Sequence, residues 1–156
     1  MNALASKAAA FVESRVFESL ALLFVRLALA DIFWRSARSK IADGSLLQIR
    51  EEAFYQFNDA PFNQVPVLNG DLGAYVTTYT EHALALLVFL GLATRLGALG
   101  LLGMTLVIQI FVFPDFATWR ITHMVWAALA LILISRGGGL FALDRLFDGR
   151  RVGTGG

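Results

Sequence analysis

The chain has 156 residues, a formal net charge of +1 and no cysteine; 57% of its residues are hydrophobic and 16% are charged. Soluble domains average roughly 45–50% apolar and about 25% charged residues, so this composition indicates a membrane protein. The balanced charge gives no sign of a nucleic-acid partner. The absence of cysteine excludes disulfides, thiol catalysis and cysteine-ligated metal sites.

The N-terminus places Lys7 and Arg15 ahead of a long apolar run, as a secretory signal peptide does. The run continues through Trp34, however, without a small-residue cleavage site. We therefore interpret it as the first membrane span rather than as a cleaved leader.

Four apolar stretches are each long enough to cross a hydrocarbon core of about 30 Å at about 1.5 Å per residue. They cover residues 17–37, 75–93, 96–113 and 119–135. None alternates apolar and polar residues as a barrel strand would, so we expect helices. The sequence thus predicts an all-α fold, a four-transmembrane-helix bundle that forms a single membrane domain over residues 1–156.

Breaks between these stretches mark the turns. Gly91, Thr94 and Arg95 interrupt a nearly continuous apolar run, which predicts a tight hairpin between the second and third helices. Pro114 and Asp115 end the third helix. Glycine recurs at every third residue of that helix, which favours close packing against a neighbour. These glycines are Gly97, Gly100 and Gly103.

The outer loop of residues 38–74 is long for a connection between helices. Apolar residues in its first half recur near helical period between charged ones, which predicts an amphipathic helix on the outer membrane surface. These residues are Leu46, Ile49, Ala53 and Phe57. Pro61 and Pro66 end this segment, and Asp71 is the predicted N-cap of the second span.

The positions of lysine and arginine near the span ends predict the orientation. Seven lie on the face that carries both termini and five on the other, so both termini are expected in the cytoplasm. After Ser135, three glycines lead into LFALDRLFDGRR, which we place at the inner interface. Residues 148–156 form the expected flexible tail.

Polar residues inside apolar spans are the main functional signal, because charge is costly in a bilayer. When the depth of each polar residue is estimated along its helix, most of them fall in one layer near the outer membrane surface, and all four spans contribute residues to this layer. The layer contains Asp31, Arg35, Glu81, His82, Thr105, Gln109, Arg120 and His123. Arg26 stands apart and is expected nearer the middle of the membrane.

Within the first span, Asp31 and Arg35 are one turn apart and can form an ion pair. Arg26 lies roughly 140° around the helix from Asp31 at about 100° per residue, so it needs a partner on another helix. Glu81 is the candidate for that partner. The polar set is explained most simply by salt bridges that fix the helix register. A ligand site or a proton site is the alternative.

His82 and His123 are the only histidines in the chain, and both fall in the outer layer. Two histidines on facing helices can ligate haem or a metal. Neither residue lies in a ligand motif such as C-x-x-C-H. The simpler interpretation is an aromatic belt around His123, between Trp119 and Trp126, and an interhelical hydrogen bond at His82.

The segment RLALADIFWRSARSKIAD resembles the first-helix motif of the DoxX family, with Arg26, Ser36 and Lys40 at the matching positions. YTEHALALLVFLGLATRLGALGLLGMTLVIQIFVFPD is similar to the second and third helices of that family, including Glu81 and the turn from Gly91. RGGGLFALDRLF resembles its C-terminal end. The resemblance extends over about residues 20–147.

This resemblance implies a four-helix integral membrane protein of the bacterial inner membrane. The family is associated with subunits of thiosulfate:quinone oxidoreductase and with other membrane oxidoreductase complexes, without one common molecular activity. We therefore expect an accessory or anchor subunit of a membrane-associated redox or stress-response system. Its expected partners are the lipid bilayer and protein subunits, with a homo-oligomer as a further assembly.

Two other functions remain open on the sequence. The chain can be a quinone- or haem-binding component of an oxidoreductase, with Glu81 or His82 as proton acceptor and Arg26 or Arg35 holding charge. It can also be a transporter of a small solute or a metal that uses the same polar cluster. Whether the chain itself is an enzyme stays undecided, because no catalytic motif is present.

Overall fold

The computed structural model describes residues 10–148, and this part of the chain is helical apart from its loops and one isolated β-bridge. The first long helix is α2 (Arg15–Ser39), and α4 (Gly70–Leu90) follows it after a loop. Next comes α5 (Thr94–Val107), which continues as the π-helical η2 (Ile108–Val112). The predicted all-α class is confirmed.

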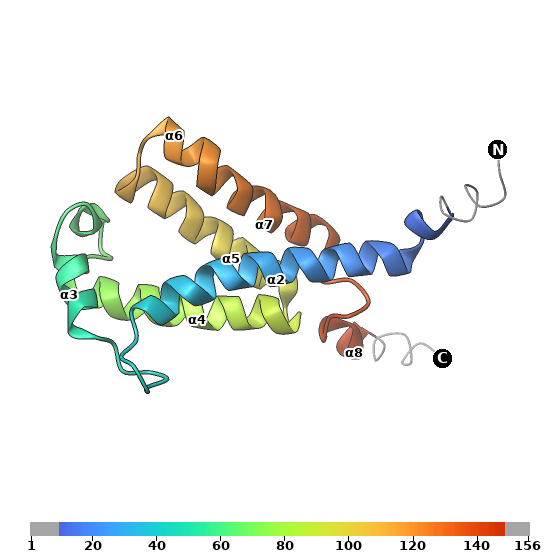
Figure 1. Cartoon of the computed structure of the whole chain (residues 1–156), viewed down its shortest axis with the longest axis horizontal. Helices are drawn as coiled ribbons and strands as arrows, with labels where there is room; N and C mark the ends of the chain where they lie inside the picture. Colours follow the sequence, from blue (N-terminus) through green and yellow to red (C-terminus); the bar gives the residue numbers. More distant parts are fainter. Residues whose placement is uncertain (1–9, 149–156) are drawn as a thin grey trace.

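The last long helical stretch begins with one short turn, α6 (Phe116–Thr118), and the π-helical segment η3 (Trp119–His123). It continues as α7 (Met124–Arg136). Three short elements complete the described chain (Figure 1). They are α3 (Glu51–Asn58), the 3₁₀ turn η1 (Phe62–Gln64) and α8 (Asp144–Asp148).

The long helices pack side by side around one apolar core. Helix α2 contacts α4 and α7, α4 contacts α5, and α5 contacts α7. At the centre of the core lie the fully buried side chains of Leu29, Phe33, Val88, Leu101 and Leu133. Because every long helix contributes to this core, residues far apart in sequence are brought to the same level of the bundle.

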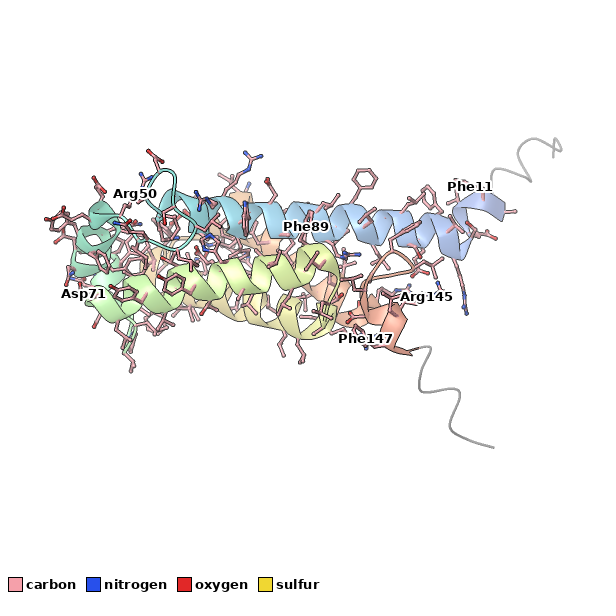
Figure 2. All side chains as sticks on the ribbon, turned by 90° about the horizontal axis from the view of Figure 1, so that it is seen from below. Phe11, Arg50, Asp71, Phe89, Arg145 and Phe147 are labelled. Atoms are coloured by element: carbon pink, nitrogen blue, oxygen red, sulfur yellow. The ribbon has the colours of Figure 1, made fainter. Side chains whose placement is uncertain are left out.

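The two ends of the bundle differ. One end carries the segment from Lys40 to Asn69, with α3 and η1, and we call it the loop end. The other carries the start of α2, the turn between α4 and α5, and α8, and we call it the tail end. Figure 2 shows Arg50 and Asp71 at the loop end, and Phe11, Arg145 and Phe147 at the tail end.

The predicted hairpin between the second and third helices is confirmed. Gly91 ends α4 in the left-handed conformation, with φ of +70°, and α5 begins three residues later. A Cβ added at Gly97 would lie 3.0 Å from Val88, and one at Gly100 would lie 2.7 Å from Leu84. These two glycines therefore let α5 approach α4 closely, as predicted. Gly103 faces open space instead.

The prediction of an amphipathic helix in the outer loop is correct only for the second half of the segment. Its second half is helical: α3 contacts α4 and buries Ala53 and Phe57, with Ala53 packed beside Ile41 and Ile49. The first half is not helical, because a bridge between Ile41 and Ile49 folds that segment back on itself. Leu46 lies outside any helix and is 78% exposed.

Asp71 was predicted to cap the second span, and this is wrong. The N-cap of α4 is Asn69, and Asp71 lies in the first turn, where it accepts a hydrogen bond from Asn58. The flexible tail predicted at residues 148–156 falls, after Asp148, outside the described residues.

Two helical stretches are long and apolar enough to cross a membrane by length and composition, Thr94–Val112 and Phe116–Arg136. Helix α2 is interrupted by Arg26, Asp31 and Arg35, and α4 contains Glu81. Where these charged side chains find their partners determines what the bundle can do.

Candidate functional site

Glu81 and Lys40 form a buried ion pair near the loop end. Nζ of Lys40 lies 2.7 Å from Oε2 of Glu81, with side-chain exposures of 7% and 2%. Lys40 follows the last turn of α2, so its long side chain turns back along the helix. It also donates to the carbonyl and hydroxyl of Ser36, each at 2.9 Å, and this hydroxyl donates to Oε1 of Glu81 at 3.0 Å. All three ammonium protons are therefore used.

His123 and Gln109 form a second polar group. Nδ1 of His123 lies 2.6 Å from Oε1 of Gln109. Nε2 of Gln109 donates to the carbonyls of Phe113 and Asp115 at 2.8 and 3.2 Å, which identifies its other end as the oxygen. Because that oxygen only accepts, Nδ1 of His123 carries the proton. A neutral His123 then keeps a lone pair on Nε2.

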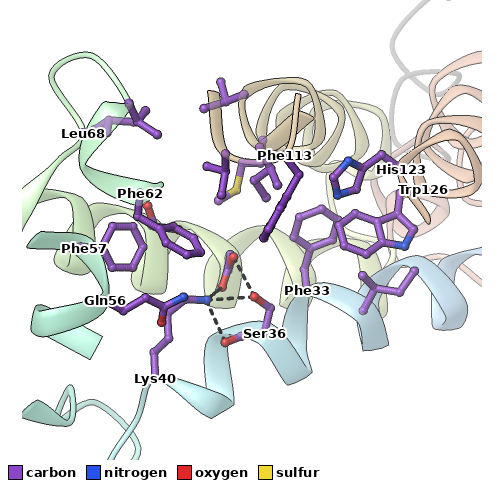
Figure 3. A pocket seen from close by; sticks show the side chains of 18 of the residues that line it. Phe33, Ser36, Lys40, Gln56, Phe57, Phe62, Leu68, Phe113, His123 and Trp126 are labelled. Carbon is purple, nitrogen blue, oxygen red and sulfur yellow. Dashed lines mark hydrogen bonds and ion pairs between the residues drawn. The ribbon is translucent and has the colours of Figure 1, made fainter. Parts of the chain in front are cut away.

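Both polar groups face one cavity of about 420 Å³ at the loop end. Its walls come from α2, from the segment with α3 and η1, and from α4, α5, η2, η3 and α7. Figure 3 shows the ion pair on one side and His123 on another, with Phe113 between them. Most of the lining is apolar or aromatic, including Phe33, Phe57 and Trp126. An apolar cavity with a few convergent polar groups is typical of a small-molecule site.

The two π-helical segments both lie at this cavity. Ile108 and Val112 of η2 line it, as does His123 at the end of η3. A π-helical turn inserts an extra residue into a helix and rotates the side chains that follow, and it is frequent at functional sites. Asp115 lies between η2 and η3, where it is the N-cap of the short turn α6 and stands outside the long helices. The backbone N–H of Thr118 donates to Asp115 and lowers the pKa of its carboxyl group.

Arg26 does not pair with Glu81, so that prediction is wrong. Its guanidinium donates to backbone carbonyls instead, at 2.9 Å to Val88 and also to Phe89 at the end of α4. Nη1 donates to Phe141 at 3.1 Å and to Gly138 at 3.4 Å. The last carbonyls of a helix lack intrahelical partners, so Arg26 acts as a cap for α4 and ties it to the loop after α7.

Arg26 lies apart from the other polar residues, as expected, and its position is near the tail end of the bundle. Helix α2 begins well beyond the other long helices and is the longest of them, so a residue in its middle lies near the tail end of the bundle (Figure 1). Arg26 is 2% exposed there, level with the turn at Gly91. It contributes no group to the cavity at the loop end.

Asp31 and Arg35 form the predicted ion pair, at 2.9 Å, but they lie on the outside of the bundle. Their side chains are 54% and 78% exposed. His82 also lies away from the cavity, with its ring against Trp34 and its Nδ1 at 3.0 Å from the carbonyl of Thr78. The predicted polar layer therefore divides into an exposed pair, a histidine against α2 and the cavity itself.

The two histidines contact different residues and different elements. His82 has Trp34 and Thr78 as neighbours, whereas His123 has Gln109 and Trp126. Within residues 10–148 there is no group of three or more histidine, aspartate or glutamate side chains that could hold a metal ion. The geometry gives no support to a haem or metal held by both histidines.

Two residues of the site were not among the candidates derived from depth. Lys40 and Ser36 complete the partners of Glu81, yet Lys40 was assigned to the loop beyond the first span. The signal that identifies them is the match to the first-helix motif, in which Ser36 and Lys40 stand at the family positions. Their separation by four residues places both on the same face of the helix.

The chain is thus an all-helical bundle with two membrane-capable helical stretches, in which a buried carboxylate, a lysine and a histidine line one largely apolar cavity. A family model described as DoxX matches residues 21–114, more than half of the chain. The chain belongs to the DoxX family and is a DoxX-like membrane protein. No curated protein and no solved structure matches it significantly.

Proposed function

We propose that this protein is an accessory subunit of a membrane-associated redox system and that its cavity holds the ring of a quinone-class molecule. The proposal rests on two hydrogen-bond acceptors, Oε1 of Glu81 and Nε2 of His123, whose residues line the same aromatic cavity at the loop end. A quinol has two hydroxyl donors on a flat apolar ring, so its donors match these acceptors.

The charges around Glu81 favour this ligand. Lys40 uses all three of its protons on Glu81 and Ser36, so it holds the carboxyl group in place. Oε1 accepts only one bond, from Ser36, and has capacity for a further donor. A bound quinone would carry two electrons and two protons. The role of the protein is to orient the ring and to accept protons at Glu81 and His123.

The proposed setting is the bacterial inner membrane, with all four long helical segments as spans. Two of the charges that interrupt α2 and α4 support this, because Arg26 and Glu81 find buried partners inside the bundle. A charge satisfied internally is tolerated in a span. The excess of lysine and arginine at the tail end supports cytoplasmic termini.

Titration of the detergent-purified protein with a short-chain benzoquinol tests the proposed ligand. Trp126 lines the cavity, so binding is expected to quench tryptophan fluorescence. Glu81→Gln replaces the carboxylate by a neutral amide and His123→Phe removes the Nε2 acceptor, and each should weaken binding roughly tenfold, or about 1.4 kcal/mol. Glu52→Gln removes an exposed carboxylate from α3 and should leave the affinity unchanged.

The subunit role is tested by copurification from native membranes, followed by identification of the proteins retained. An oxidoreductase subunit recovered in fixed proportion would support the proposal. A protein that binds no quinol, or one that turns over a substrate alone and retains no partner, would overturn it. The thermal unfolding of each variant without ligand serves as the control for folding.

A further inference from the structure

A second cavity, of about 590 Å³, lies at the tail end, away from the cavity assigned to the quinone. It is open to the surface and is bordered by the turn between α4 and α5 and by the chain from the end of α7 to α8. Three arginines line it, namely Arg95, Arg136 and Arg145. The lining as described contains one acidic residue, Asp144. Its carboxylate is engaged by the backbone amides of Ala93 and Thr94, at 2.6 and 2.9 Å.

The three guanidinium groups keep free donors. Arg95 makes one bond of 3.2 Å, to the carbonyl of Ser135. Arg136 pairs at 3.2 Å with Glu18, and both side chains are largely exposed. Arg145 has no ion pair with any residue in the range 10–148. Each guanidinium carries five N–H groups, so this cavity offers many cationic donors to a ligand in one place.

The rim of the cavity is apolar. Leu96, at the start of α5, is 70% exposed, and Phe147, in α8, is 56% exposed; both belong to the lining. The cavity also lies where the long helices end, at Leu90 and Arg136. Arginines at helix ends beside exposed apolar side chains match the boundary between lipid headgroups and acyl chains.

We propose that this cavity binds the phosphate of an anionic phospholipid headgroup, held by Arg95, Arg136 and Arg145, with the acyl chains along Leu96 and Phe147. The positive charge selects a phosphate ester without a compensating ammonium. The apolar rim selects a lipid over a soluble phosphate, because a free phosphate ion gains nothing from Leu96 or Phe147. The inference concerns the opposite end of the molecule from the quinone cavity and does not depend on it.

Native mass spectrometry of the detergent-purified protein tests the proposal, with phosphatidylglycerol, phosphatidylcholine and inorganic phosphate as separate probes. Phosphatidylglycerol should remain bound and phosphatidylcholine should not. Arg145→Gln should weaken phosphatidylglycerol about fivefold, the effect of roughly 1 kcal/mol per cationic side chain near the surface. Leu96→Ser should weaken the lipid as well but leave any binding of inorganic phosphate unchanged.

The matched control is Arg120→Gln, which removes an exposed arginine from η3 near the loop end. Its affinity for phosphatidylglycerol should stay within twofold of the parent protein. An equal loss in Arg120→Gln would show that only net charge matters and would overturn the site. Equal retention of phosphatidylcholine would do the same. If inorganic phosphate binds as tightly as the lipid and Leu96→Ser changes nothing, the ligand is a soluble phosphate and the lipid assignment is wrong.

Discussion

Oε2 of Glu81 lies 2.7 Å from Nζ of Lys40, and this contact joins the middle of α4 to the end of α2. Both side chains are buried, and Ser36 bonds to each of them. The pair has two consequences. It avoids the penalty of two isolated charges inside the bundle, and it fixes the carboxyl group of Glu81 at the wall of the cavity.

Removal of either partner should destabilise the fold strongly, because the other charge is then buried and unpaired. We expect Glu81→Gln and Lys40→Met each to lower the free energy of unfolding by about 3–5 kcal/mol. The double variant should lose much less than the sum of the two. A double-mutant cycle from denaturant unfolding in micelles measures this coupling.

The exposed pair of Asp31 and Arg35 provides the control for that cycle. Both side chains are largely exposed, so Asp31→Asn should have a far smaller effect than Glu81→Gln. Strictly additive effects of Lys40→Met and Glu81→Gln would mean that the two residues do not support one another, against the observed contact.

The orientation can be tested with single cysteines, because the chain has none of its own. Leu46 is 78% exposed at the loop end and Phe147 is 56% exposed at the tail end. In intact spheroplasts, a membrane-impermeant maleimide should label Leu46→Cys. It should label Phe147→Cys only after permeabilisation. The reverse labelling pattern would show that the orientation is the opposite of the proposed one. Labelling of both cysteines in intact spheroplasts would contradict an even number of spans.

The long helices were predictable because apolar runs of membrane length leave few alternatives. The predicted spans at 17–37 and 119–135 begin and end within a few residues of helical stretches in the structure. The turn at Gly91 was predictable for a local reason, since glycine adopts positive φ without strain. These are properties of short segments, and sequence patterns describe short segments well.

The partners of the buried charges were not predictable in the same way. Arg26 bonds only to backbone carbonyls, which every residue has, so no side-chain pattern reveals them. Its level in the bundle also depends on how far α2 extends beyond its neighbours, which the helix alone does not determine. Lys40 was placed in the outer loop of residues 38–74, but its flexible stem carries the ammonium back to Glu81.

Gly91 should be intolerant of any side chain. Its φ is +70°, and an added Cβ would lie 2.6 Å from the Cβ of Ala142 and 2.7 Å from Cζ of Arg26. Gly91→Ala is therefore expected to lower the unfolding midpoint in detergent. Gly103→Ala is the matched control, because a Cβ there meets no atom within 4 Å and the position is helical. It should be neutral or stabilising by about 0.5–1 kcal/mol. Similar losses in both variants would mean that the turn is not specifically restricted.

Arg26→Leu should destabilise the protein more than Arg35→Leu. The substitution leaves the carbonyls of Phe89 and Phe141 without this donor, whereas that of Val88 keeps its bond from the N–H of Gly91. Each buried unpaired acceptor costs about 1–3 kcal/mol. Arg35→Leu removes only a largely exposed guanidinium from Asp31. At roughly 2–4 °C per kcal/mol for a chain of this size, the difference should be clear in a thermal unfolding scan.

Arg26→Lys separates the effect of charge from that of shape. The guanidinium reaches the last turn of α4 with one edge and the loop after α7 with another, which a single ammonium cannot do at the same distances. We therefore expect Arg26→Lys to recover only part of the loss seen in Arg26→Leu. Full recovery would show that a positive charge alone is sufficient at this position. Equal effects of Arg26→Leu and Arg35→Leu would show that the cap on α4 contributes little, since only Arg26 holds two segments together.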